Sequence, residues 1–136
     1  MCGIVGITGN KPVADILING LKRLEYRGYD SSGIAVSNGG LNIFKAKGKI
    51  SELENVTRGE NLEGLTGIAH TRWATHGPPN VINAHPHCDG NCDVVIVHNG
   101  IIENFTALKT RLAASGHEFI SDTDSEVLAH LISEYY

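Results

Sequence analysis

The stretch Cys2-Gly3-Ile4-Val5-Gly6-Ile7-Thr8 directly follows Met1 and decides how the rest of the chain is interpreted. Its β-branched residues predict a first strand, which Gly9-Asn10 ends. If Met1 is removed, Cys2 carries both a thiol and a free α-amine. The α-amine has a reference pKa of about 7.7–8.0, so it can serve as general base for the thiol of the same residue. Position alone favours a plainer interpretation, a small apolar residue in an edge strand.

The composition predicts one globular domain that spans residues 1–136. Of these residues 41% are hydrophobic and 19% are charged, which is enough apolar content for a core. The net charge is −4 and no basic stripe is present, which argues against a nucleic acid partner. No apolar run approaches the roughly 18 residues of a membrane helix, and no signal peptide precedes the first strand. We therefore expect a cytoplasmic protein without a membrane partner.

The three cysteines do not indicate a disulfide framework, because their number is odd. A thiol nucleophile at Cys2 would need reducing surroundings. His85, His87, Cys88 and Cys92 lie within eight residues and could in principle bind zinc. Their spacing is not that of a familiar zinc finger, so we expect no metal, and a metal-binding structural module is the weakest alternative.

The hydrophobic pattern predicts strands and helices that alternate in an α+β or layered αββα domain. Asn38-Gly39 predicts a hairpin, and the continuous apolar run 94–97 predicts a strand buried on both faces. Thr123 and Glu126 predict a capping box at the start of the last helix. Strands are expected at residues 4–8, 33–36, 41–44, 66–71, 93–98 and 117–121. Helices are expected from residue 13 to a stop near Arg27-Gly28, and at residues 50–56, 102–112 and 123–132.

Some polar residues match the needs of a thiol that attacks a carboxamide. The tetrahedral intermediate needs donors for its oxyanion, which the side chain of Asn99 and the backbone N–H of Gly100 can supply; one such donor is typically worth about 2.7–4 kcal/mol. Arg72 has the planar fork that binds a carboxylate, and Asp124 could bind an ammonium group. Taken singly, a turn at Asn99-Gly100 and a residue next to a helix N-cap at Asp124 explain these residues equally well.

Five motifs in the same order resemble the class II glutamine amidotransferases. The similarity spans nearly the whole chain and is strongest to the glutaminase domains of the glucosamine-6-phosphate synthases, the isomerising glutamine–fructose-6-phosphate aminotransferases. The motifs are CGIVG at residues 2–6, LEYRGYDS at 24–31, HTRWATHG at 70–77, NAHPH at 83–87 and HNGIIEN at 98–104.

The resemblance implies a four-layer αββα N-terminal-nucleophile fold and a reaction that needs no cofactor. In this family the cysteine attacks the side-chain amide of L-glutamine, ammonia leaves, and water hydrolyses the γ-glutamyl thioester to glutamate. The ammonia converts fructose 6-phosphate to glucosamine 6-phosphate in the full-length enzyme. The implied catalytic residues are Cys2, Asn99 and Gly100; the implied glutamine-binding residues are Arg72, Trp73, Thr75, His76 and Asp124; Arg27 and His85 are possible supporting residues.

Family members continue into two sugar-isomerase domains that bind fructose 6-phosphate, and the full-length enzyme is expected to be a homodimer. The last helix expected in this chain has no stop signal before Tyr136, so we expect a partial glutaminase domain that cannot make glucosamine 6-phosphate alone. A retained Met1 would block the α-amine of Cys2 and abolish activity.

Two further alternatives remain open. The first is the glutaminase half of a phosphoribosylpyrophosphate amidotransferase or an asparagine synthetase, although the residues around Arg27 and Arg72 favour the hexosamine branch. The second is a non-catalytic module that binds glutamine or a partner protein. Glutamate release by protein that has lost Met1 would exclude that module.

Overall fold

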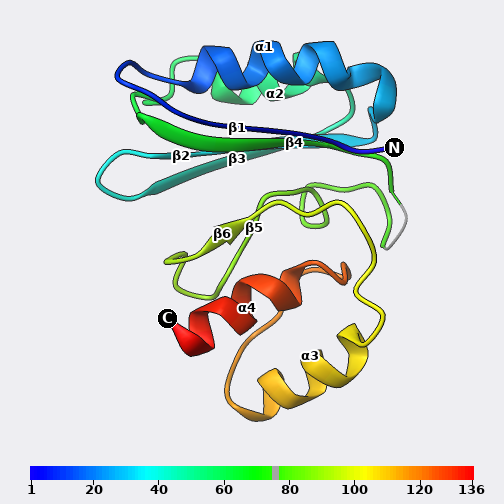
Figure 1. The fold of residues 1–136 in the computed structure, drawn as a ribbon. Helices are drawn as coiled ribbons and strands as arrows, with labels where there is room; N and C mark the ends of the chain where they lie inside the picture. The colour runs from blue at the N-terminus through cyan, green and yellow to red at the C-terminus, as the bar shows by residue number, and fades with distance from the viewer. Residues whose placement is uncertain (75–76) are drawn as a thin grey trace.

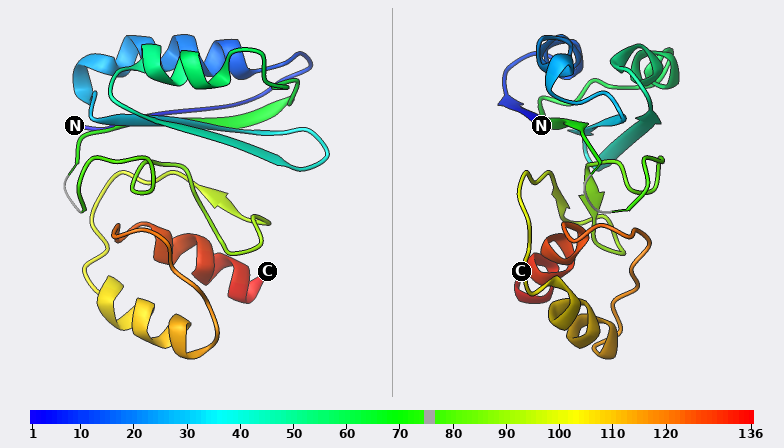
Figure 2. Two further views of the ribbon diagram at one scale, coloured as in Figure 1. Left: turned by 180° about the vertical axis from the view of Figure 1, so that it is seen from behind. Right: turned by 90° about the vertical axis from the view of Figure 1, so that its right-hand side faces the viewer.

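Helices and sheets lie on one another in four layers, as α, β, β and α (Figure 1). The computed structural model describes residues 1–74 and 77–136. The helices α1 and α2 cover one face of a four-stranded sheet, and the opposite face lies over a two-stranded sheet, α3 and α4 (Figure 2). The elements are β1 (Gly3–Thr8), α1 (Ala14–Leu24), a 3-10 turn (Glu25–Arg27), β2 (Ser31–Ser37), β3 (Leu41–Lys47), α2 (Ile50–Thr57), β4 (Thr66–Arg72), β5 (His87–Cys88), β6 (Val95–Ile96), α3 (Phe105–Ala114) and α4 (Glu126–Tyr135).

The four-stranded sheet has the order β1-β4-β2-β3, and every neighbouring pair is antiparallel. Residues directly opposite in such pairs share a face. Ala69 of β4 lies opposite Val5 and Ile34, and all three face the helices. The next residue, His70, lies opposite Gly33 and therefore faces the second sheet. The alternation along β4 thus supplies one face to the core and the other to the space between the sheets.

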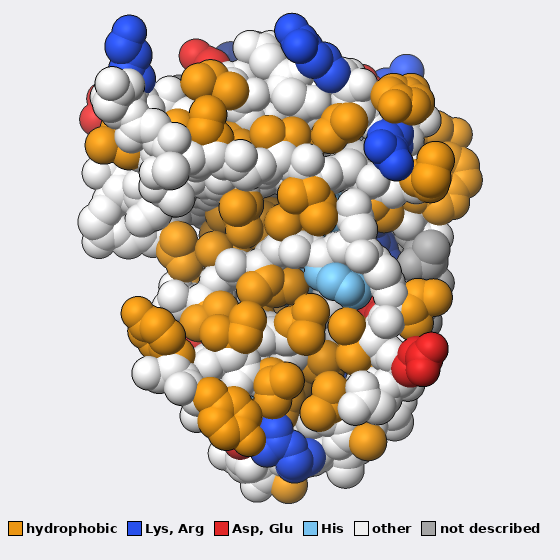
Figure 3. All heavy atoms as spheres, in the orientation of Figure 1, with side chains coloured by type: hydrophobic (Ala, Val, Ile, Leu, Met, Phe, Trp, Pro, Cys, Tyr) orange, Lys and Arg blue, Asp and Glu red, His pale blue; other side chains and the backbone are white. Residues whose placement is uncertain are grey.

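The core between the helices and the four-stranded sheet is apolar. Leu17 and Leu21 of α1, Leu53 of α2, and Ile34 and Val36 of β2 are all fully buried there. Burial of such a side chain is worth roughly 1.5–3 kcal/mol. On the surface, hydrophobic side chains also gather along the boundary between this sheet and the layers below it (Figure 3). No helix in the described parts of the chain combines the length and apolar character needed to cross a bilayer.

The elements expected from the sequence in residues 1–72 are confirmed, as are the helices that became α3 and α4. The strand expected at 93–98 is reduced to β6, which is half-buried rather than buried on both faces. Among the described residues it pairs only with β5, which is also two residues long. A short edge pairing of this kind cannot bury both faces of a strand.

Glu126 explains two wrong predictions. Its buried carboxylate accepts the backbone N–H groups of Ile120, at 2.9 Å, and Ser121, at 2.7 Å. Those N–H groups are therefore not available to a neighbouring strand, and residues 117–121 form none. Nor does Glu126 form a capping box with Thr123: the N-cap of α4 is Ser125, and its side chain makes no cap hydrogen bond.

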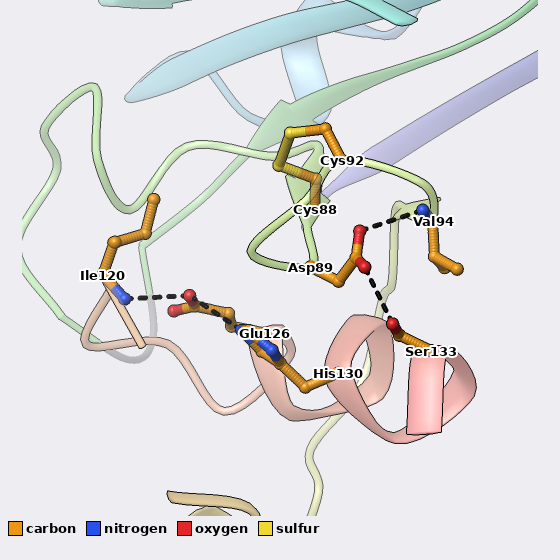
Figure 4. Close-up of a disulfide and its surroundings, with 8 residues drawn as sticks. All are labelled: Cys88, Asp89, Cys92, Val94, Ile120, Glu126, His130 and Ser133. Atoms are coloured by element: carbon orange, nitrogen blue, oxygen red, sulfur yellow. Dashed lines mark hydrogen bonds and ion pairs between the residues drawn. A yellow bond between two sulfur atoms is a disulfide. The ribbon is translucent and has the colours of Figure 1, made fainter. Parts of the chain in front are cut away.

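The sequence-based expectation for the cysteines is also corrected, because Cys88 and Cys92 form a disulfide (Figure 4). A turn brings them together: Cys92 N–H donates to the backbone oxygen of Asp89 at 3.0 Å. The carboxylate of Asp89 accepts the N–H of Val94 at 2.9 Å and the hydroxyl of Ser133 at 2.8 Å, which ties the turn to α4. An odd cysteine count did not reveal this pair because Cys2 is the third, unpaired thiol.

Gly33 sets how closely the second layer approaches the sheet. A Cβ at this position would collide with the backbone oxygen of His85 and would lie 3.0 Å from that of Phe44. Backbone atoms on both sides leave no side chain that could move aside. The loop that carries His85 therefore depends on glycine at this point of β2.

We expect Gly33→Ala to lower the free energy of unfolding by about 1–3 kcal/mol, the usual cost of overpacking. The matched control is Gly40→Ala at the end of the same hairpin, where a Cβ would meet no atom within 4 Å. Urea unfolding of both variants and the wild type measures the difference. Equal stability of the two variants would contradict this account of the contact.

Candidate active site

A cavity of about 350 Å³ lies where the four-stranded sheet meets the second layer, close to the N-terminus. It brings together all the site residues expected from the sequence that the structure describes, from both halves of the chain. Thr75 and His76 lie outside the described residues. The cavity is lined by Met1, Cys2, Arg27, His70, Arg72, Trp73, His85, His98, Asn99, Gly100, Ile101, Thr123, Asp124 and Ser125.

Cys2 is placed by the pairing of β1 with β4. Gly3 lies opposite Thr71 and donates its N–H to the Thr71 hydroxyl at 3.1 Å, so Cys2 lies beside the end of β4. The N–H of Trp73 donates to the Cys2 sulfur at 3.2 Å, and the thiol reaches the Trp73 carbonyl oxygen at 3.6 Å. The thiol is partly exposed and lines the cavity, so a ligand there can reach it.

Asn99 contacts Cys2, and Gly100 lines the same cavity, although both are far from Cys2 in sequence. The Asn99 amide nitrogen donates to the Cys2 carbonyl oxygen at 3.2 Å. The Asn99 amide oxygen lies 2.7 Å from Nε2 of His70. Gly100 has a φ of 146°, a conformation that side chains disfavour. An amide NH₂ therefore lies beside the thiol-bearing residue.

Arg72 and Asp124 bring opposite charges to the same cavity from β4 and from the segment before α4. Burial lowers the pKa of Arg72, while the nearby Cys2, Asp30 and Asp124 act to raise it. The guanidinium also donates to the Pro78 carbonyl oxygen at 3.4 Å. One oxygen of Asp124 accepts the N–H of Ile102 at 2.7 Å. A cation and an anion on one cavity suit a zwitterionic amino acid.

Three buried histidines lie at the cavity: His70 and His85 line it, and His87 contacts His85. The rings of His70 and His85 stack with centroids 4.2 Å apart, and His85 meets His87 edge-on at 4.4 Å. Burial lowers the pKa of His70 to about 4 and that of His87 to about 3, and it lowers the pKa of His85 as well. All three are therefore neutral at neutral pH.

His85 and His87 were candidate zinc ligands together with Cys88 and Cys92, which the disulfide joins to each other. No group of three or more His, Cys, Asp or Glu side chains in residues 1–74 and 77–136 is arranged to hold a metal ion. The donor set of a thiolate zinc site is therefore lacking in the described structure.

Sequence reasoning gave no role to several residues that the structure places at the site. His98 Nδ1 lies 3.0 Å from the Ser125 hydroxyl, and the Thr123 hydroxyl lies 3.0 Å from His87 Nε2. These contacts join the start of α4 to the segments that carry Asn99 and His85. Of these residues, only His70 could have been predicted from the sequence. Side chains alternate between the two faces of a strand, so His70 lies on the same face of β4 as Arg72.

A family model described as the glutamine amidotransferase domain matches residues 43–135. The chain belongs to this family. It is 62% identical over 133 residues to glutamine–fructose-6-phosphate aminotransferase (isomerizing) of Caulobacter vibrioides, covering 97% of this chain and 22% of the relative. It is 55% identical over 139 residues to the protein of that name from Chlorobaculum tepidum, covering 100% of this chain and 23% of the relative. The chain thus spans less than a quarter of the length of these relatives.

Two solved structures resemble the fold. Glutamine phosphoribosylpyrophosphate amidotransferase from B. subtilis, in complex with ADP and GMP, superposes with a TM-score of 0.81 at 32% identity. A structure described as the allosteric regulatory enzyme of purine biosynthesis superposes with a TM-score of 0.83, also at 32% identity. Each match covers 98% of this chain and 29% of the other. The αββα N-terminal-nucleophile fold expected from the resemblance is confirmed.

The buried histidines predict that acid destabilises the folded chain. Histidine has a pKa of about 6.5 when unfolded, whereas burial lowers that of His70 to about 4 and that of His87 to about 3. Between about pH 6.5 and pH 4 the unfolded chain therefore binds more protons. As the pH is lowered through that window, the free energy of unfolding should decrease by up to about 1.4 kcal/mol per pH unit for each histidine.

Urea unfolding at intervals from pH 7.5 to pH 4.5 measures this slope. His87→Gln removes one of the titrating rings and keeps a side chain that can hydrogen-bond to Thr123. We expect a flatter slope for that variant below pH 6.5. Equal slopes for the variant and the wild type would show that His87 does not resist protonation in the folded state.

Proposed function

We propose that this chain hydrolyses the side-chain amide of L-glutamine to glutamate and ammonia, with Cys2 as nucleophile. The observation that carries the proposal is the single cavity lined by the Cys2 thiol, the Asn99 amide, the Arg72 guanidinium and the Asp124 carboxylate. Membership of the glutamine amidotransferase domain family supports the same reaction. Each group has one task, and the tasks follow from its chemistry.

The nucleophile and its base belong to one residue. Removal of Met1 gives Cys2 a free α-amine that takes the thiol proton as sulfur attacks the amide carbon of glutamine. The C–N bond then breaks, and the amine returns the proton to the departing ammonia. Water adds to the thioester by the same route, which releases glutamate and restores the thiol.

The oxyanion that forms during each attack is bound by the Asn99 side-chain NH₂ and the Gly100 backbone N–H in this proposal. The Asn99 side-chain nitrogen is 3.2 Å from the carbonyl oxygen of Cys2, so this donor lies beside the residue that carries the nucleophile. Donors already in place stabilise developing charge without reorganisation. In the proposal the φ of 146° at Gly100, which side chains disfavour, lets the backbone N–H of Gly100 serve as the second donor.

Substrate binding uses the paired charges. We assign Arg72 to the α-carboxylate of glutamine and Asp124 to its ammonium group. Around the glutamine side chain we assign Trp73, which is half-exposed, together with Thr75 and His76. Arg27 and His85 are assigned supporting roles beside the nucleophile, and both line the cavity.

The wider context is inferred from the relatives. Because they are named as isomerizing glutamine–fructose-6-phosphate aminotransferases, we propose that residues 1–136 are part of a glutaminase domain whose ammonia serves the conversion of fructose 6-phosphate to glucosamine 6-phosphate. The acceptor would bind to isomerase domains of the parent chain, which we expect to be a homodimer. We assign the parent chain to the cytoplasm, where Cys2 stays reduced. The Cys88–Cys92 disulfide argues against this location, because disulfides are uncommon in the cytoplasm.

The first test is intact mass before and after treatment with the glutamine analogue 6-diazo-5-oxonorleucine. We expect loss of Met1 and one covalent adduct, because the analogue places its electrophilic carbon where the thiol attacks. Cys2→Ala is the control and should take no adduct. A chain that has lost Met1, stays folded and gains no adduct would refute the proposed nucleophile.

The second test is Arg72→Lys, which keeps the positive charge but loses the fork that holds a carboxylate. We expect KM for glutamine to rise by roughly 10- to 100-fold, the equivalent of about 1.5–3 kcal/mol for a hydrogen bond to a charged group. Glutamate release against glutamine concentration measures it. The control is Arg58→Lys, an exposed position beyond α2; an unchanged KM in Arg72→Lys would remove Arg72 from substrate binding.

A further inference from the structure

We propose that His70 is a positioning residue: its Nε2–H holds the Asn99 amide in the orientation that presents NH₂, rather than oxygen, to the oxyanion formed at Cys2. This inference rests on the proposed function. It assigns a role to a residue that is linked to Cys2 by hydrogen bonds through Asn99.

The geometry forms a short chain of three residues. His70 Nε2 lies 2.7 Å from the Asn99 amide oxygen, and the Asn99 nitrogen lies 3.2 Å from the Cys2 carbonyl oxygen. His70 is 1% exposed and lies in β4, opposite Ile4 of β1, so the sheet holds its ring at a set distance from the start of β1. Stacking on His85, with an interplanar angle of 19°, restrains rotation of the ring.

Shape alone does not select an amide orientation, because the oxygen and nitrogen of asparagine differ little in size. The hydrogen bonds do select it. A flipped Asn99 would place its oxygen beside the carbonyl oxygen of Cys2, with no proton between two acceptors. It would also require His70 to accept at Nε2 and carry its proton at Nδ1.

The proton at Nδ1 would then lack a well-placed acceptor. Nδ1 of His70 is buried and makes no hydrogen bond of acceptable geometry among the described residues; the backbone of His98 acts to raise the pKa of the ring, but by less than burial lowers it. A buried N–H without a partner is costly. Burial lowers the pKa of His70 to about 4, so the ring is neutral and carries only one N–H. That N–H at Nε2 satisfies the Asn99 oxygen and leaves the Asn99 nitrogen free to face the nucleophile.

A positioning role has a distinct kinetic signature. The Asn99 donor is needed when negative charge develops on the substrate oxygen, so loss of its orientation lowers kcat. In the proposed function glutamine is bound through its charged groups at Arg72 and Asp124 and not through Asn99, so KM should change little. General damage to the site would alter both constants.

The test compares His70→Phe with His70→Gln in the whole 136-residue chain. Phenylalanine keeps a ring to stack on His85 but has no donor, and glutamine restores an N–H near Nε2. We expect His70→Phe to lower kcat for glutamine hydrolysis by about 10- to 100-fold, less than the 10²–10³ typical of a deleted oxyanion donor. KM should stay within about twofold, and His70→Gln should recover most of the lost kcat.

A double-mutant cycle with Asn99→Ala shows whether His70 acts through Asn99. In the Asn99→Ala background, His70→Phe should have no further effect on kcat. Losses that multiply would overturn the inference, as would an unchanged kcat in His70→Phe. If His70→Phe does not show a cooperative thermal unfolding transition, His70→Leu takes its place in the cycle.

Alkylation of Cys2 by iodoacetamide is the control that needs no oxyanion donor, and its rate should be unchanged in all variants. Glutamate release by the wild type distinguishes failure of the proposed function from failure of the role of His70. Wild-type chain lacking Met1 that releases no glutamate refutes the proposed function itself. A wild type that is active, with His70→Phe equally active, refutes the role of His70 alone.

Discussion

The antiparallel pairing of β4 with β1 and β2 is the constraint on which the rest of the structure depends. It places Ala69 in the apolar core and His70 and Arg72 on the opposite face, where they reach the cavity. It also brings the start of β1 to the end of β4, which puts the Cys2 sulfur 3.2 Å from the Trp73 N–H. A shift of one residue in either pairing would exchange the two faces and remove core and site together.

Much of this organisation could be predicted from the sequence. Apolar periodicity identified α1 and α4, the Asn38-Gly39 turn identified the β2–β3 hairpin, and the motifs around Cys2, Arg72 and Asn99 identified residues that meet at one cavity. These signals are local, because each depends on residues a few positions apart or on a run of recognisable letters.

The wrong predictions have a common physical cause. Glu126 looked like a helix cap in sequence, but its carboxylate is buried and binds the N–H groups of Ile120 and Ser121. The Cys88–Cys92 pair depends on a turn that Asp89 ties to α4. In each case a buried carboxylate, that of Glu126 or Asp89, accepts hydrogen bonds that shape an irregular segment. No local sequence pattern specifies which groups donate these hydrogen bonds. The contact between His70 and Asn99 was missed for the same reason.

Residues separated by 71 and 97 positions form the contacts of Cys2 with Trp73 and Asn99. Such long-range contacts form late, because the intervening chain must first be ordered. During synthesis Cys2 emerges before these partners, which follow only when residue 99 has been made. Until the intervening chain has folded, Cys2 lacks the surroundings on which the proposed reaction depends.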